Sequence, residues 1–151
     1  MIKSINEFII QFHGWSFPIN LEKICDKLNI KIKQKILPKY LRAYYDHKNR
    51  TIFINSNLDK TRARFYIAME IRQAQYPFEK ISLKEKREFA LELLLPTEEF
   101  LQKWNSFEPT QIIGCAMYFD ITSNVVISKF KNLQRKGVLS EKMFKNFSTI
   151  S

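Results

Sequence analysis

The chain has 151 residues, of which 45% are hydrophobic and 14% aromatic, with 3 glycines and 5 prolines. This is the composition of one ordered globular unit, and it excludes a disordered or low-complexity chain. The net charge of +10 favours acidic partners, including nucleic acid, unless the lysines reflect a genome rich in A and T and serve only solubility.

The N-terminal stretch MIKSINEFIIQFHGW does not have the pattern of a secretory signal. Its apolar run is interrupted by Glu7 and Gln11, and no small-residue cleavage site follows. No stretch of the chain approaches the roughly 20 apolar residues that span a bilayer. Cys25 and Cys115 lie in apolar helical patterns and form no CxxC motif, which is typical of buried thiols in a reducing compartment. We therefore expect a cytoplasmic protein without membrane contact.

The segment after Pro18 predicts a helix followed by a small sheet. Leu21, Ile24, Cys25 and Leu28 fall at helical spacing, with Asn20 as the N-cap candidate. Alternating, β-branched and aromatic residues then appear in NIKIKQKI, YLRAYYDH and RTIFIN, separated by turn-like segments. We expect these three runs to form a largely antiparallel sheet.

Three helices are predicted next. The segment from Asn57 or Asp59 to Tyr76 contains no glycine or proline, and Asp59 is a candidate N-cap. The segment SLKEKREFALELLL begins with Ser82 and Glu85 in capping-box spacing and ends before Pro96, and the short PTEEFLQKW follows.

The C-terminal part predicts two helices across a tight turn. EPTQIIGCAMYF and SNVVISKFKNLQRKG are separated by DIT, with Thr122 or Ser123 as the cap and Gly137 as the end. Such a pair resembles a helix-turn-helix. The order of elements predicts an α+β fold with an N-terminal extension (1–17), a first domain (18–106) and a C-terminal helical subdomain (107–151) packed on it.

The sequence RFYIAMEIRQAQY contains a five-residue frame of catalytic interest. In zinc proteases, the motif HExxH places two histidines one turn apart on a helix, and its glutamate activates the zinc-bound water. Met69, Glu70, Ile71, Arg72 and Gln73 occupy that frame here, and only Glu70 is of the expected type. By itself one glutamate on a helix is more often a solvated side chain than a catalytic base.

The surroundings of this frame resemble the ImmA/IrrE family of metallopeptidase-like proteins. The resemblance is carried, in order and spacing, by PINLEKICDKLNIKI, the pair AYYD and TIFIN, RARFYIAMEIRQ, EFALELLLP and FDITSNVVISKFKNL. It covers about residues 18 to 137. It implies a zincin-like domain with a helix of the active-site type, although each block alone is also compatible with an ordinary amphipathic helix.

In this resemblance the zinc ligands are missing. Met69 and Gln73 stand where the two histidines would be, and Arg72 replaces the glycine between them. The third, acidic ligand should fall near Leu83 to Glu85; Glu85 could supply it, but the register points equally to Leu83. A thioether and a neutral carboxamide bind zinc poorly, so we expect no metal and no cofactor. Glu70 then has no nucleophile to activate, and we expect it to be solvated or engaged by a basic residue.

No other catalytic site has sequence support. His13 and His47 are the only histidines, and neither has an acidic or cysteine partner at ligand spacing. We expect a surface or structural role for each. There is also no glycine-rich phosphate loop.

Two functions from different classes remain. The resemblance implies a catalytically inactive regulatory protein that binds a partner such as a helix-turn-helix repressor or a phage or mobile-element protein, with Arg72 as a binding candidate. The alternative is nucleic-acid binding by the basic C-terminal helices, against the more ordinary interpretation of a solvated helix that packs on the domain through Val125, Val126, Phe130 and Leu133. Its candidates are Asn124 and Ser128 near bases, and, for phosphates, Lys129, Lys131, Arg135, Lys136, Lys142 and Lys145. A hydrolase with rearranged ligands is a third, weaker hypothesis.

Overall fold

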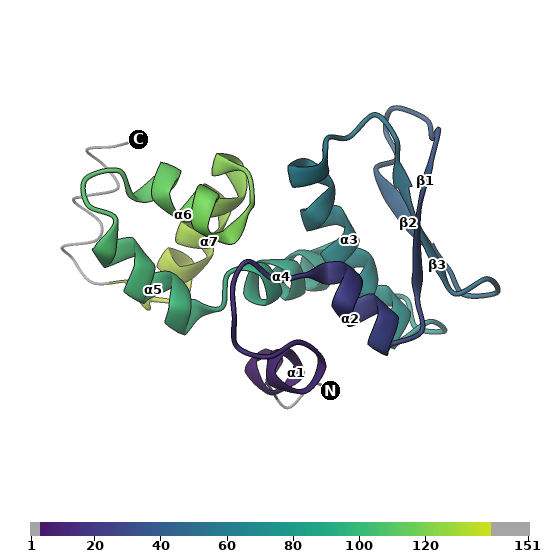
Figure 1. The fold of residues 1–151 in the computed structure, drawn as a ribbon, viewed down its shortest axis with the longest axis horizontal. Coiled ribbons are helices and arrows are strands. Elements are labelled where there is room, and N and C mark those ends of the chain that lie inside the picture. Colours follow the sequence, from purple (N-terminus) through teal and green to yellow (C-terminus); the bar gives the residue numbers. More distant parts are fainter. Residues whose placement is uncertain (1–3, 140–151) are drawn as a thin grey trace.

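The computed structural model describes residues 4–139 and has an α+β fold, as the sequence predicts (Figure 1). In chain order the elements are α1 (Ile5–Phe12), α2 (Leu21–Lys27), β1 (Lys31–Lys35), β2 (Ala43–Asp46), β3 (Thr51–Asn55), α3 (Lys60–Gln75), α4 (Leu83–Leu94), α5 (Thr97–Ser106), α6 (Gln111–Phe119) and α7 (Ser123–Arg135).

Four of the helices begin where the capping residues predict. The side chains of Asn20, Asp59, Ser82 and Thr122 each accept a hydrogen bond from the backbone N–H three residues ahead, at the starts of α2, α3, α4 and α7. A cap of this kind satisfies one of the N–H groups that the first turn leaves unpaired. The local sequence therefore determines where the helices of the candidate site begin.

The sheet is mixed, whereas the alternating pattern led us to expect a largely antiparallel one. Its order is β1-β3-β2, and β3 pairs with β1 in parallel and with β2 antiparallel. The chain crosses from β1 to the far edge before β2 begins, so β3 enters between them. This central position explains why Ile52 and Ile54 are buried, while the edge strand β1 is largely exposed and carries lysines that discourage further pairing.

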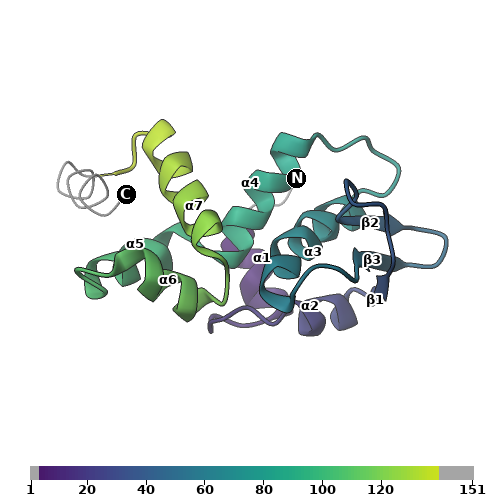
Figure 2. The same ribbon diagram turned by 90° about the horizontal axis from the view of Figure 1, so that it is seen from above.

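The elements form two groups joined by α4 (Figures 1 and 2). In both views α3 lies beside the sheet, and α5, α6 and α7 lie together at the opposite end, with α4 between the groups. The buried hydrophobic residues form a single cluster that includes Ile52 of β3, Leu93 of α4 and Phe130 of α7. The two groups therefore share one core.

Helix α1 was not predicted, because residues 1–17 were assigned to an extension. Ser4 caps it, and Phe8 and Ile9 are buried, with the Phe8 ring 5.9 Å from that of Phe89 in α4. Its apolar residues lie at positions 5, 8, 9 and 12, which is helical spacing. The division into domains stays a prediction.

A buried arginine connects three distant parts of the chain. Arg64 of α3 is 7% exposed and donates hydrogen bonds to the backbone carbonyls of Ile19 at 2.7 Å, Asp120 at 2.7 Å and Phe119 at 3.3 Å. Its Nε also lies 3.7 Å from the Asp120 carboxylate. A planar guanidinium with five N–H donors can satisfy several acceptors at once. Arg64 therefore fixes the turn between α6 and α7 against α3.

Candidate functional site

The frame Met69 to Gln73 lies in the second half of α3, which packs against both α4 and the sheet. Met69 and Glu70 are buried, with 5% and 7% of their surface exposed. Met69 and Gln73 are four residues apart and so share one face of the helix. The side-chain amide of Gln73 donates to the backbone carbonyls of Tyr76 and Glu79, at 3.0 and 2.9 Å. The Gln73 side chain therefore stabilises the turn that follows α3.

Glu70, which we predict to occupy the position of a catalytic base, is paired with a lysine of α4. Lys86 Nζ lies 3.4 Å from Glu70 Oε2. Burial raises the pKa of Glu70 above its usual range, and Lys86 together with a hydrogen bond from the Tyr45 backbone offsets that effect only in part. The carboxylate thus belongs to a buried ion pair.

Arg72 and Glu85 form a second ion pair beside the first. Arg72 Nε donates to Glu85 Oε2 at 2.9 Å. The Arg72 guanidinium also lies over the rings of Tyr76 and Phe89, 4.7 and 5.6 Å from their centres. The candidate third ligand is therefore neutralised by a cation, and Leu83, the other candidate position, is 54% exposed.

The raised pKa of Glu70 predicts how its removal affects stability. A native pKa above the unfolded value means that the native state gains stability as the pH falls through the native pKa. Glu70→Gln should therefore be as stable as the wild type at pH 7 or more stable, with a free energy of unfolding higher by about 1 kcal/mol at most. Its unfolding temperature should be equal or higher. The difference should shrink as the pH falls toward 4.5, the unfolded value.

Thermal unfolding at several pH values measures this effect, with the exposed Glu98→Gln as control. A Glu70→Gln variant that is clearly less stable than the wild type at pH 7 would contradict the expectation, because the ion pair with Lys86 would then outweigh the cost of burial.

The donor set does not fit zinc. Residues 4–139 contain no group of three or more His, Cys, Asp or Glu side chains placed to hold a metal ion. His13 is buried, its Nδ1 lies 2.8 Å from the Gly14 carbonyl oxygen, and its Nε2 accepts from the Asn20 N–H at 2.9 Å. His47 Nδ1 lies 3.1 Å from the Tyr45 hydroxyl. Both imidazoles therefore have partners other than the frame on α3.

The structure corrects the role of Lys129. Its side chain is fully buried, and Nζ lies 2.6 Å from Glu92 Oε2 and 3.0 Å from Thr97 Oγ1. Burial raises the pKa of Glu92, but Lys129 and Thr97 outweigh burial and the net pKa is lowered. Lys129 cannot contact phosphate. The spacing from Val126 to Lys129 and Leu133 places it in the buried stripe of α7, which is the signal that would have shown this.

The remaining C-terminal candidates fall in three places. Asn124, Ser128, Lys131 and Arg135 line a groove described below. Lys136 lines a separate cavity of about 330 Å³ that also includes Arg72 and Glu85. Lys142 and Lys145 lie outside the described residues.

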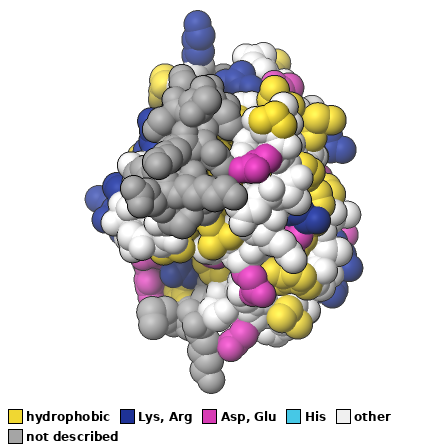
Figure 3. Space-filling model, turned by 90° about the vertical axis from the view of Figure 1, so that its left-hand side faces the viewer, with side chains coloured by type: hydrophobic (Ala, Val, Ile, Leu, Met, Phe, Trp, Pro, Cys, Tyr) yellow, Lys and Arg dark blue, Asp and Glu magenta, His cyan; other side chains and the backbone are white. Residues whose placement is uncertain are grey.

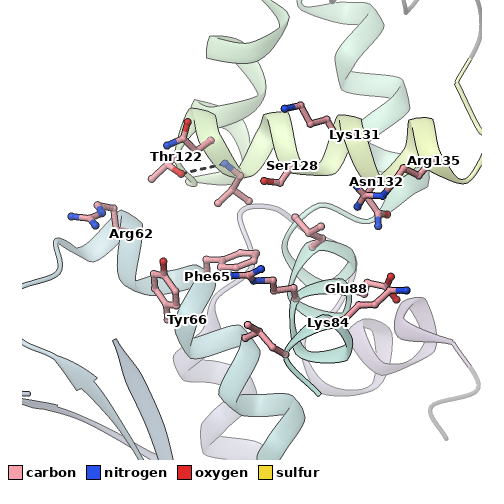
Figure 4. Close-up of a pocket in the computed structure, with 15 residues that line it drawn as sticks. Arg62, Phe65, Tyr66, Lys84, Glu88, Thr122, Ser128, Lys131, Asn132 and Arg135 are labelled. Carbon is pink, nitrogen blue, oxygen red and sulfur yellow. Dashed lines mark hydrogen bonds between the residues drawn. The ribbon is translucent and has the colours of Figure 1, made fainter. Parts of the chain in front are cut away.

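The groove, of about 940 Å³, lies between α3 and α4 on one side and α7 on the other (Figure 4). In Figure 4, Ser128 and Asn132 of α7 lie opposite α4, while Arg62 and Arg135 lie near the two ends of the groove. Five basic residues line it against the single acid Glu88: Arg62, Lys84, Arg87, Lys131 and Arg135. The apolar part of the lining consists of Phe65, Tyr66, Leu83, Leu91 and Val125. We call it the cationic groove.

The sequence did not single out Arg62, Lys84 or Arg87, because they become neighbours of Lys131 and Arg135 only when α7 packs opposite α3 and α4. One signal was present. Arg62, Tyr66, Met69 and Gln73 follow one another at three- or four-residue spacing, so the lining of the groove and the frame lie along the same stripe of α3.

Comparison with known proteins gives a family and a fold. Residues 25–131 match a peptidase family model described as an IrrE N-terminal-like domain. Among solved structures, a Mycobacterium tuberculosis transcriptional regulator matches 81% of this chain with a TM-score of 0.61 at 16% identity, which shows a shared fold. The match covers 44% of that protein, so the chain spans less than half of its length. No curated protein matches.

Within residues 4–139, no helix is both long enough and apolar enough to cross a membrane.

Proposed function

Because this chain belongs to the family of IrrE N-terminal-like peptidase domains, we propose that it is a metal-free member that binds a regulatory protein without cutting it. The observation that carries the proposal is that two carboxylates of the predicted site each form an ion pair. Glu70 and Glu85, which would act as base and ligand, are each paired with a cation, Lys86 and Arg72.

Hydrolysis is opposed by the residues at the ligand positions and by the ion pairs that Glu70 and Glu85 form. Zinc in a catalytic site needs three protein ligands and an open position for water, and Met69 and Gln73 supply neither imidazole. Arg72 adds a positive charge that would repel a dication. The Glu70 carboxylate also has Lys86 Nζ, 3.4 Å away, as its hydrogen-bond partner in place of a water molecule. What these residues retain is packing between α3 and α4.

The proposed partner is a repressor-like protein or another protein of a phage or mobile element. This part rests on the family resemblance, and it agrees with the matched structure, which is that of a transcriptional regulator. Two free, buried cysteines support action in the cytoplasm. Helix α7 lies across a groove from the first half of α3 and from α4, so the helix pair can contribute to a surface on the same helix as the frame.

Nucleic-acid binding is the alternative function. Of its described candidates, Lys129 is excluded by burial, and Lys131 and Arg135 line a concave groove rather than a convex face. A recognition helix must enter the major groove of DNA, which requires a protruding surface. The observations therefore favour the protein partner.

Metal analysis and partner capture test the proposal together. Protein purified without chelators should contain well below one zinc per chain, and a tagged chain expressed in its host should co-purify with a partner that mass spectrometry finds uncut. Stoichiometric zinc, or recovery of the partner as specific fragments, would refute the proposal of a non-catalytic protein.

A further inference from the structure

We propose that the cationic groove binds an acidic, amphipathic helical segment of the partner protein. The inference rests on the proposed function, since it describes the chemistry of the same partner. Three features carry it: the cations that line the groove without an ion pair to a described residue, the apolar lining of the groove, and its length.

The basic side chains of the groove differ from four cations that are buried or partly buried. Arg64, Arg72, Lys86 and Lys129 each have a carboxylate partner. By contrast, none of the five groove cations takes part in an ion pair with a described residue, and all five are exposed. Five cations beside one carboxylate, Glu88, repel one another and attract an anion. The end of the molecule in Figure 3, in contrast, shows basic, acidic and hydrophobic side chains interspersed.

The groove also offers apolar contact. Leu83 is 54% exposed although it lies in the lining, and Phe65 and Val125 are half-buried. A ligand that only carried negative charge would leave these side chains in water. A segment with an apolar face and acidic flanks satisfies both parts of the lining, in the manner of a helix in a groove.

The length of the groove suits such a segment. On α7 the lining extends from Thr122 to Arg135, which at 1.5 Å per residue is about 20 Å. A helix of about thirteen residues has that length. Its apolar residues at helical spacing would face Leu83 and Val125, and its acidic residues would meet cations on both walls.

Single-stranded nucleic acid fits less well. Its bases need exposed aromatic faces on which to stack. Of the two aromatic residues in the lining, Tyr66 has the Arg42 guanidinium over its ring, 5.5 Å from the centre, and Phe65 packs edge-on against Tyr66 at 5.8 Å. The other apolar lining residues are aliphatic. The lining therefore favours the side chains of a peptide over bases.

Fluorescence anisotropy with defined probes tests the inference. The probe is a labelled 20-residue peptide with leucines at helical spacing and glutamates elsewhere. Its controls are a scrambled peptide of the same composition, a single-stranded oligothymidylate and a DNA duplex. The full chain should bind the amphipathic peptide with a Kd of about 100 μM or below, and the scrambled peptide at least about fivefold more weakly.

Matched variants locate the binding. Lys84→Glu with Lys131→Glu reverses one charge on each wall of the groove and should weaken peptide binding at least about tenfold. Lys33→Glu with Lys39→Glu makes the same change at exposed positions outside the groove and should alter binding less than about threefold. Leu83→Ser, at an exposed position, should weaken binding about fivefold through the apolar contact.

The inference is overturned if peptide binding is undetectable at about 1 mM, if both double variants lose the same affinity, or if either nucleic acid binds more tightly than the peptide. Partner capture keeps the two proposals distinct. If the wild type and the Lys84→Glu with Lys131→Glu variant capture an intact partner equally well, the groove proposal alone is refuted, whereas cleavage of the partner would refute the proposed function.

Discussion

The triple substitution Met69→His, Arg72→Gly and Gln73→His is expected to create a zinc site on α3 with a dissociation constant of about 1 μM or below, where the parent shows none. Two imidazoles would then stand one turn apart on the same helical face. Removing Arg72 takes away a cation and frees Glu85, now held at 2.9 Å, to act as a third ligand. A glutamate introduced by Leu83→Glu is the alternative third ligand.

Calorimetric titration and zinc-dependent melting measure this gain. The new variant loses the hydrogen bonds from Gln73 to the Tyr76 and Glu79 carbonyls, so its apo form should melt below the parent. Zinc at 100 times the dissociation constant should then add about 2.7 kcal/mol of stability. The control Met69→His with Arg72→Gly has one imidazole and should bind at least about tenfold more weakly.

A folded triple variant that ignores zinc with either glutamate would mean that the register of the frame was misassigned. Family membership would stand, because it rests on residues 25–131 as a whole. The assignment of Met69 and Gln73 to the ligand positions would be withdrawn.

Arg64→Met is expected to lower the free energy of unfolding by about 3–5 kcal/mol. Methionine fills a similar volume but donates no hydrogen bond. The carbonyls of Ile19, Phe119 and Asp120 would each lose their link to α3. A buried acceptor without a donor costs about 1–3 kcal/mol, so the loss exceeds that of one ordinary contact.

Urea denaturation decides this, with Arg62→Met as the matched control two residues earlier in α3. Arg62 is exposed and forms no ion pair with a described residue, so its replacement should change stability by less than about 0.5 kcal/mol. Equal effects of the two substitutions would show that water replaces Arg64 at the three carbonyls.

Local signals predicted much of the fold. The caps at Asn20, Asp59, Ser82 and Thr122 were correct because capping depends on a few adjacent residues. The pairing of β1 with β3 was not predictable from alternation, since period-two patterns are the same in parallel and antiparallel edge strands. Helix α1 was not predicted, although its apolar residues at positions 5, 8, 9 and 12 have helical spacing.

Part of the candidate site could likewise be predicted from local sequence, and the rest depends on tertiary packing. The frame on α3 could be located because its members are close in sequence. The partners of Glu70 and Arg72 come from α4, and the cationic groove combines α3 and α4 with α7, so both depend on tertiary packing. Lys129 was misassigned because basic residues on a C-terminal helix were treated as exposed, although its spacing from Val126 places it among the buried residues.

Arg64 and Lys129 together have a consequence for the kinetics of recognition. Arg64 holds the residues just before α7 to α3, and Lys129 holds the middle of α7 to Glu92 at the end of α4. With the helix fixed at two points, the walls of the groove keep their separation before any ligand arrives. A preorganised receptor loses little conformational entropy on binding, so association should be limited by collision and by folding of the incoming segment, with no prior opening of the receptor.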